Sequence, residues 1–138
     1  MFPSYNFQFA DHHLIEKITV ITDSTDGDDG CPACLRIKIS QPENSCTTPI
    51  LHDLTGDKTY SGSEIGDCGD LRIDINLPID VTFQHETTDG FKGKFAILRT
   101  MPNSYQCPIT EWLDSDDSNY ENSFSTRCIA AGKYNKIK

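Results

Sequence analysis

Short segments in which apolar and polar residues alternate constrain the fold of this chain more than any other feature. Residues 18–22 and 35–39 both show this pattern, with Ile18, Val20 and Thr22 at alternate positions of the first segment and leucine or isoleucine at alternate positions of the second. A period of two residues is typical of a half-buried β-strand, because successive side chains point to opposite faces of a sheet. No segment shows the longer period of a convincing amphipathic helix. The pattern therefore predicts an all-β protein.

Further segments extend this interpretation along the chain. Clear alternation recurs in the segments 71–77, 79–85 and 95–100, and Asp89-Gly90 is a favoured pair for a hairpin turn. A short helical turn is expected over 111–117. The other predicted strands are 2–9, 47–51, 58–61 and 123–131.

Together these segments predict an antiparallel β-sandwich of about eight strands, because turn signals recur roughly every 8 to 12 residues. At 138 residues the chain is expected to form a single domain over 1–138, with its own core. The side chains expected to point inward are Ile18, Val20, Leu35, Ile37, Ile39, Leu71, Ile73, Ile75, Ile79, Val81, Phe83 and alternate residues of 95–98.

The cysteines indicate disulfide bonds. There are six, an even number, and they are Cys31, Cys34, Cys46, Cys68, Cys107 and Cys128. Six cysteines allow 15 pairings. We expect the pair Cys107–Cys128, because it would staple the polar segment between them. The predicted compartment is extracellular, where disulfides form and persist.

The Cys31-Pro-Ala-Cys34 motif has two competing interpretations. Its spacing occurs in zinc sites, but a closed zinc site needs a second cysteine pair, and the other cysteines are widely separated. A redox role would require a thiol in a positive field, usually at a helix N-terminus. An acidic segment precedes this motif and a strand follows it. Disulfides are therefore favoured over both alternatives.

Charge and hydropathy exclude two classes of function. The formal net charge is −9, without a run of lysine or arginine, so a nucleic acid partner is not expected. A membrane-spanning helix needs about 20 apolar residues, and the longest apolar run is far shorter. Residues 1–4 lack the basic start of a signal peptide, so the sequence is expected to begin at a mature N-terminus.

An acidic segment, residues 23–30, separates the first two clear strands. Its four carboxylates belong to Asp23, Asp26, Asp28 and Asp29, and its glycines are Gly27 and Gly30. Such a segment can offer Ca²⁺ several oxygen ligands, although it lacks the EF-hand register. The alternative is a solvated turn whose charge maintains solubility. The sequence leaves both interpretations open.

Catalytic motifs are absent from the sequence. It has no nucleophile elbow, no zinc-protease motif, no phosphate-binding loop and no dinucleotide-binding glycine pattern. Four histidines among many acidic residues will form chance pairs, so a hydrolase stays a minor alternative. We expect a non-enzymatic protein.

The order of these features resembles that of the PLAT and C2 group of β-sandwich domains. A strand (18–22), an acidic loop (23–30) and a second strand (35–39) are followed by a glycine-rich middle and a later strand, 79–83. The run 89–97 resembles the loop and returning strand of that group, and the likeness covers about residues 14–100. It implies a calcium site in which Asp89 assists the four aspartates of residues 23–30.

Two functions follow as expectations. The first is a secreted binding module that recognises a lipid surface, a glycan or a protein through loops at one end of the sandwich, with calcium as a possible cofactor. The second is a structural or packaging protein of a secreted matrix, venom or egg fluid, without a calcium role. The oligomeric state is not predicted.

Overall fold

The structure is a computed structural model that describes residues 12–22, 31–86, 90–100, 103–110, 112–114 and 122–132. These residues form twelve β-strands and two short 3₁₀ turns, η1 (Gly62–Glu64) and η2 (Gly66–Asp70). The strands are β1 (His12–Leu14), β2 (Lys17–Thr22), β3 (Leu35–Gln41), β4 (Asn44–Thr47), β5 (Asp57–Ser61), β6 (Arg72–Asp74), β7 (Asp80–His85), β8 (Phe91–Arg99), β9 (Ser104–Pro108), β10 (Trp112–Leu113), β11 (Ser123–Arg127) and β12 (Ile129–Gly132).

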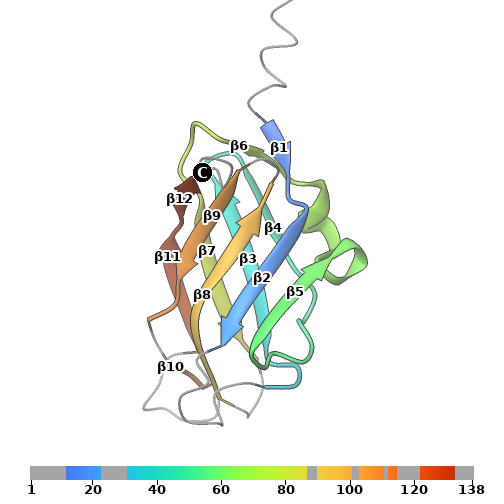
Figure 1. Ribbon diagram of the computed structural model, residues 1–138, viewed down its shortest axis with the longest axis vertical. Coiled ribbons are helices and arrows are strands. Elements are labelled where there is room, and N and C mark those ends of the chain that lie inside the picture. The colour runs from blue at the N-terminus through green and yellow to red at the C-terminus, as the bar shows by residue number, and fades with distance from the viewer. Residues whose placement is uncertain are drawn as a thin grey trace, which may run out of the picture.

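Two antiparallel sheets face each other and form a β-sandwich (Figure 1). The six-stranded sheet has the order β12-β9-β8-β2-β5, and β10 also pairs with β8. The four-stranded sheet has the order β11-β7-β3-β4. A separate pair, β1 with β6, lies beyond the sandwich at one end. The predicted all-β sandwich is confirmed.

The strand count is higher than predicted because several strands are very short. β9 and β10 occupy a region in which the sequence pattern is weak, and β10 replaces the helical turn expected over 111–117 at Trp112 and Leu113. Pairing with β8 favours the extended conformation there, which local sequence does not reveal. The strand expected at 47–51 ends instead at Thr47. The predicted strand 2–9 lies outside the described residues.

The last predicted strand, 123–131, is two strands in different sheets. β11 pairs with β7 of the four-stranded sheet, and β12 pairs with β9 of the six-stranded sheet. The chain crosses between the layers at Cys128, which forms a disulfide with Cys107 of β9. This crossing closes one lateral side of the sandwich.

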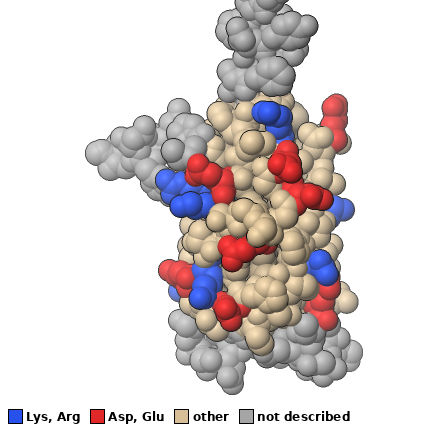
Figure 2. Space-filling model, turned by 90° about the vertical axis from the view of Figure 1, so that its right-hand side faces the viewer, with Lys and Arg blue, Asp and Glu red and all other residues tan. Residues whose placement is uncertain are grey.

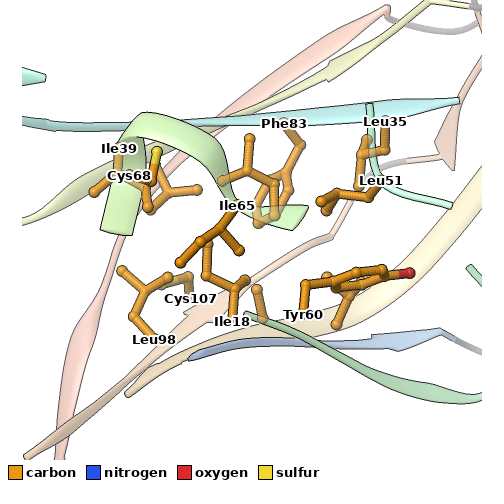
Figure 3. Close-up of a cluster of buried hydrophobic side chains, with 14 of the residues drawn as sticks. Ile18, Leu35, Ile39, Leu51, Tyr60, Ile65, Cys68, Phe83, Leu98 and Cys107 are labelled. Carbon is orange, nitrogen blue, oxygen red and sulfur yellow. The ribbon is translucent and has the colours of Figure 1, made fainter. Parts of the chain in front are cut away.

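The inward faces of both sheets form one hydrophobic core, part of which is seen in Figure 3. The predicted inward residues of β2, β3 and β7 are buried, and Ala96 and Leu98 are the inward pair of β8. Ile75 is an exception, since it follows the end of β6 in a turn and is only half-buried. Truncation of a core side chain such as Phe83 typically costs about 3 to 5 kcal/mol.

All six cysteines form disulfides, and the expected pair Cys107–Cys128 is confirmed. Cys46–Cys68 joins β4, an edge of the four-stranded sheet, to η2. The 3₁₀ turns follow β5, which is the edge of the six-stranded sheet on that side (Figure 1). Two of the three disulfides therefore pin the two lateral sides of the sandwich.

A buried glutamine organises the end of the sandwich near β6. The Gln41 side chain donates to the backbone oxygens of Asp74 and Leu77, at 2.9 and 3.3 Å, and accepts from the Asp74 N–H at 2.9 Å. Gln41 is 8% exposed. Its amide thereby joins the end of β3 to backbone groups of the β6–β7 connection.

Candidate functional site

The end of the sandwich opposite β1 and β6 gathers the described residues that flank three acidic segments of the sequence. β2 ends there at Thr22, and the described chain resumes at Cys31. Two backbone hydrogen bonds, of 3.0 and 2.9 Å, join Cys31 to Leu54. The N–H of Glu86, at the end of β7, donates to the Cys34 oxygen at 2.9 Å. The N–H of His85 donates to the Asn122 oxygen at 2.9 Å. We call this the loop end.

Acidic residues are concentrated in the segments between these anchor points. Residues 23–30 contain four acidic residues, 86–90 contain two and 111–122 contain five, which is eleven of the 21 in the chain. None of the three segments contains lysine or arginine. On the side that carries β5 and the 3₁₀ turns, by contrast, acidic and basic side chains are interspersed (Figure 2). Most of the net negative charge of the chain therefore lies in the three segments that begin and end at the loop end.

The predicted calcium ligands Asp23, Asp26, Asp28, Asp29 and Asp89 all lie outside the described residues. Among the residues that the structure describes, no three histidine, cysteine, aspartate or glutamate side chains are grouped so as to hold a metal ion. The described carboxylates, such as those of Glu86 and Asp114, thus do not constitute a metal site by themselves. Coordination at this end would need the aspartates of the flanked segments.

Thr22 is a feature of the loop end that sequence analysis did not single out. Its side chain is 5% exposed, and its hydroxyl oxygen has no hydrogen-bond partner among the residues that the structure describes. A buried polar group without a partner typically costs about 1 to 3 kcal/mol. The signal was present in the sequence, because Thr22 continues the inward alternation of Ile18 and Val20. A buried oxygen thus lies where the segment 23–30 begins.

The Cys31–Cys34 disulfide lies where the same segment ends. The two residues are 2% and 0% exposed, and their Cα atoms are 5.9 Å apart. Neither sulfur is a thiolate, so this motif is neither a zinc ligand pair nor a reactive dithiol in this structure. The disulfide closes a four-residue ring immediately before β3 begins.

An ion pair neutralises Arg36 beside the loop end. Its Nε donates to the Glu86 carboxylate at 2.7 Å, and its Nη1 lies 3.5 Å from the Thr48 oxygen. Arg36 lies beside Gln84 in the register of β3 and β7, and so it faces outward. The pair fixes the position of Glu86 at the end of β7.

Tyr60 is a buried titratable group whose pKa is strongly raised. Burial, together with the carboxylates of Asp53 and Glu64, raises the pKa of Tyr60 to about 12. Its hydroxyl donates to the backbone oxygen of His52 beside a small cavity of about 150 Å³. Tyr60 therefore stays protonated near neutral pH and acts as a hydrogen-bond donor, which is a structural role.

Comparison with models of known protein families and with curated proteins finds no match to this sequence. Within the described residues, no helix has the length and apolar character needed to cross a membrane.

Proposed function

We propose that this protein is a secreted binding module in which calcium, held by aspartates of the loop end, mediates recognition of a ligand. The ligand classes are a lipid surface, a glycan or a protein. The observation that carries the proposal is the shared anchoring of three acidic segments at one end of a rigid, disulfide-stapled sandwich. Carboxylates so tethered repel one another, and a divalent cation would relieve that repulsion.

The buried hydroxyl of Thr22 supports the same proposal. It adjoins Asp23 in the sequence, and a buried oxygen without a partner in the described part of the chain is a potential ligand or a partner for a metal-bound water. Bound calcium would also give the acidic end affinity for anionic groups, which its own charge repels. Extracellular modules of this kind bind calcium with dissociation constants of roughly 10⁻⁴ to 10⁻³ M.

The proposed extracellular location is supported by the cysteines. All six are paired, and three disulfides in a chain of 138 residues are typical of oxidising compartments. Mass spectrometry of the native protein should detect no alkylatable thiol. Two or more reactive thiols without denaturant would contradict this assignment.

Thermal unfolding in calcium and in EDTA tests the proposal. A ligand that binds only the folded state stabilises it by RT ln(1 + [L]/Kd), which gives on the order of 1 kcal/mol at a few millimolar calcium. The melting temperature should therefore rise by a few degrees. The double variant Asp26→Asn, Asp28→Asn should lose this gain and be more stable than the natural protein in EDTA.

The control variant is Asp67→Asn with Asp70→Asn. These two exposed aspartates belong to η2, so the variant removes the same charge away from the loop end. It should keep the calcium response in full. Identical melting curves in calcium and EDTA for the natural protein would exclude the calcium site.

A structural or packaging protein of a secreted matrix, venom or egg fluid is the second candidate. The observation that favours it is the disulfide pinning of both lateral sides, which would confer durability. Calcium-dependent pull-down with liposomes or glycans distinguishes the two. A packaging protein should show no EDTA-sensitive binding and should self-associate.

A further inference from the structure

A cavity of about 150 Å³ lies on the lateral side of the sandwich that carries β5 and the 3₁₀ turns. One wall is the segment 49–52, which follows β4, and the other is the segment in which β5 passes into η1. The site described above makes no use of this cavity beyond the hydroxyl of Tyr60. We call it the Tyr60 cavity.

The Tyr60 cavity is preformed. The hydroxyl of Tyr60 donates to the backbone oxygen of His52 and so joins the two walls. Gly66, the first residue of η2, approaches Pro49 so closely that a Cβ there would lie 2.9 Å from the proline Cδ. The disulfide between β4 and η2 ties the same turns to the four-stranded sheet. The cavity therefore keeps its shape without a ligand.

The inner part of the cavity is mainly apolar. Pro49, Ile50 and Leu51 supply aliphatic side chains, and the side chain of Tyr60 lines the cavity from β5. Figure 3 shows Leu51 and Tyr60 near each other at the edge of the core. A cavity of this volume accepts a compact group of about six heavy atoms. The occupant is therefore a small molecule or a single side chain.

The rim of the cavity is negatively charged. Glu64 lines it, and its carboxylate accepts a hydrogen bond of 3.1 Å from the Ser61 N–H, which fixes its position. A carboxylate retains further acceptor sites for a ligand. Burial raises the pKa of Tyr60 most, and the carboxylates of Asp53 and Glu64 raise it further. Both charges thus act on the side chain that lines the cavity.

Basic side chains near the cavity do not cancel this charge. Among the residues that the structure describes, no lysine or arginine lines it. Lys58 precedes Tyr60 by two positions in β5 and is half-buried. Lys17 lies beside Ser61 but alternates with inward Ile18, so it points to the outer face of the sheet. Even with Lys58 counted, the carboxylates of Asp53 and Glu64 leave an excess of negative charge.

These properties select an organic cation. In the described part of the chain, His52, Asp53 and Glu64 are not grouped so as to hold a metal ion. Aliphatic walls favour an alkyl chain, and an ammonium group is attracted both to carboxylates and to aromatic rings. We propose that the Tyr60 cavity binds a short alkylammonium group, with its chain between the apolar walls and its charge at Glu64.

Two sources offer this chemistry, a free small amine and the side chain of a lysine on a partner protein. The proposal does not depend on calcium, because none of the lining residues is a proposed calcium ligand. Failure of one proposal therefore leaves the other intact.

Amide NMR titration with n-butylammonium chloride, in EDTA and at constant ionic strength, tests the proposal. The signals of Leu51, Ser63 and Glu64 should shift and saturate, with a dissociation constant on the order of 1 mM. n-Butanol has the same chain without the charge and should bind roughly fivefold more weakly. Nα-acetyl-lysine methylamide distinguishes the sources. Binding as tight as that of butylammonium would indicate a protein lysine, and exclusion of the capped lysine would indicate a free amine.

A charge variant tests the role of Glu64. Glu64→Gln keeps an oxygen that can accept from the Ser61 N–H, and it should raise the dissociation constant for butylammonium roughly threefold. Asp70→Asn is the matched control, because Asp70 is exposed in η2 and does not line the cavity. It should leave binding unchanged. Thermal unfolding followed by circular dichroism would show that both variants are folded.

Three results would overturn the proposal. The first is the absence of saturable shifts at Leu51, Ser63 and Glu64 when butylammonium is well above its expected dissociation constant. The second is equal affinity for butylammonium and n-butanol, which would mean that the cavity does not select charge. The third is equal weakening by Glu64→Gln and Asp70→Asn, which would mean that the net charge of the protein, and not the cavity, attracts the cation.

Discussion

The two sheets share one core but differ on their outer faces. In the four-stranded sheet, inward Leu35, Ile37 and Ile39 alternate with outward polar residues. In β2 and β8 of the six-stranded sheet, some outward positions also hold apolar side chains, namely Ile21, Phe95 and Ile97. The difference teaches that strict alternation predicts which face of a strand is buried, whereas apolar residues on both faces leave that choice to strand register.

The largest expected effect on the free energy of unfolding distinguishes a core residue from a residue on the polar outer face. Ile37→Ala should lower the free energy of unfolding by about 2 to 5 kcal/mol, because Ile37 is fully buried between the sheets. Its neighbour Lys38 points outward, and Lys38→Ala should change stability by only about 0.5 kcal/mol. Urea unfolding followed by circular dichroism measures both. Similar values for the two variants would contradict the assignment of inner and outer faces.

A slightly smaller effect is expected from the disulfide at the lateral crossing. Replacing Cys107 and Cys128 by alanine opens a bond between residues 21 positions apart, and a loop of this length is worth about 3 kcal/mol. The same substitution of Cys46 and Cys68, 22 positions apart, should give a similar loss. Equal destabilisation would show that both lateral sides hold the sheets together. A loss confined to one pair would show that only that side does so.

The apolar side chains on the outer face of the six-stranded sheet should contribute little to stability. Ile97→Ser removes a half-buried side chain, and we expect a loss of about 1 kcal/mol or less. Thr82→Ser on the polar face should be close to neutral. Denaturant unfolding measures the two. A loss for Ile97→Ser as large as that of Ile37→Ala would mean that Ile97 is part of the core.

The smallest effect is a pH dependence on the polar face. A side-chain hydrogen bond from Arg127, at 2.9 Å, holds the pKa of Asp80 below its ordinary value of 3.8. Since the folded-state pKa is lowered, the ionised form is favoured on folding. The stabilisation is therefore present above pH 3.8 and is lost as the pH falls through the folded-state pKa.

NMR titration of the Asp80 carboxylate checks this prediction. The midpoint should lie below 3.8 in the natural protein and move upward in Arg127→Gln. An unchanged midpoint would show that the pair, which is exposed, is not formed in solution.

Most of the fold could be predicted from the sequence, and the reasons are local. Alternation identified the inward residues of β2, β3 and β7, because burial on one face imposes it. The weak pattern of β9 and β10 could not be interpreted, since pairing with β8 determines their conformation. The division of 123–131 between two sheets also depends on contacts far away in the sequence.

The candidate site could be predicted only in part. The even number of cysteines indicated disulfides, but only Cys107–Cys128 could be named, because pairing depends on tertiary distance. The aspartates proposed as calcium ligands lie outside the described residues and stay a prediction. The outward direction of Phe95 and Ile97 was not predicted, because the alternation in residues 95–98 allowed either face to point inward. Strand register was needed to place Phe95 and Ile97 outside.

Amide NMR spectra recorded during a calcium titration test the proposed site at the loop end most directly. If calcium binds there, the signals of Thr22, Cys31 and Glu86 should shift as calcium is added, and those of Thr82 and Ser125, on the polar outer face, should not. An absence of shifts at the loop end, or shifts confined to Thr82 and Ser125, would contradict the account.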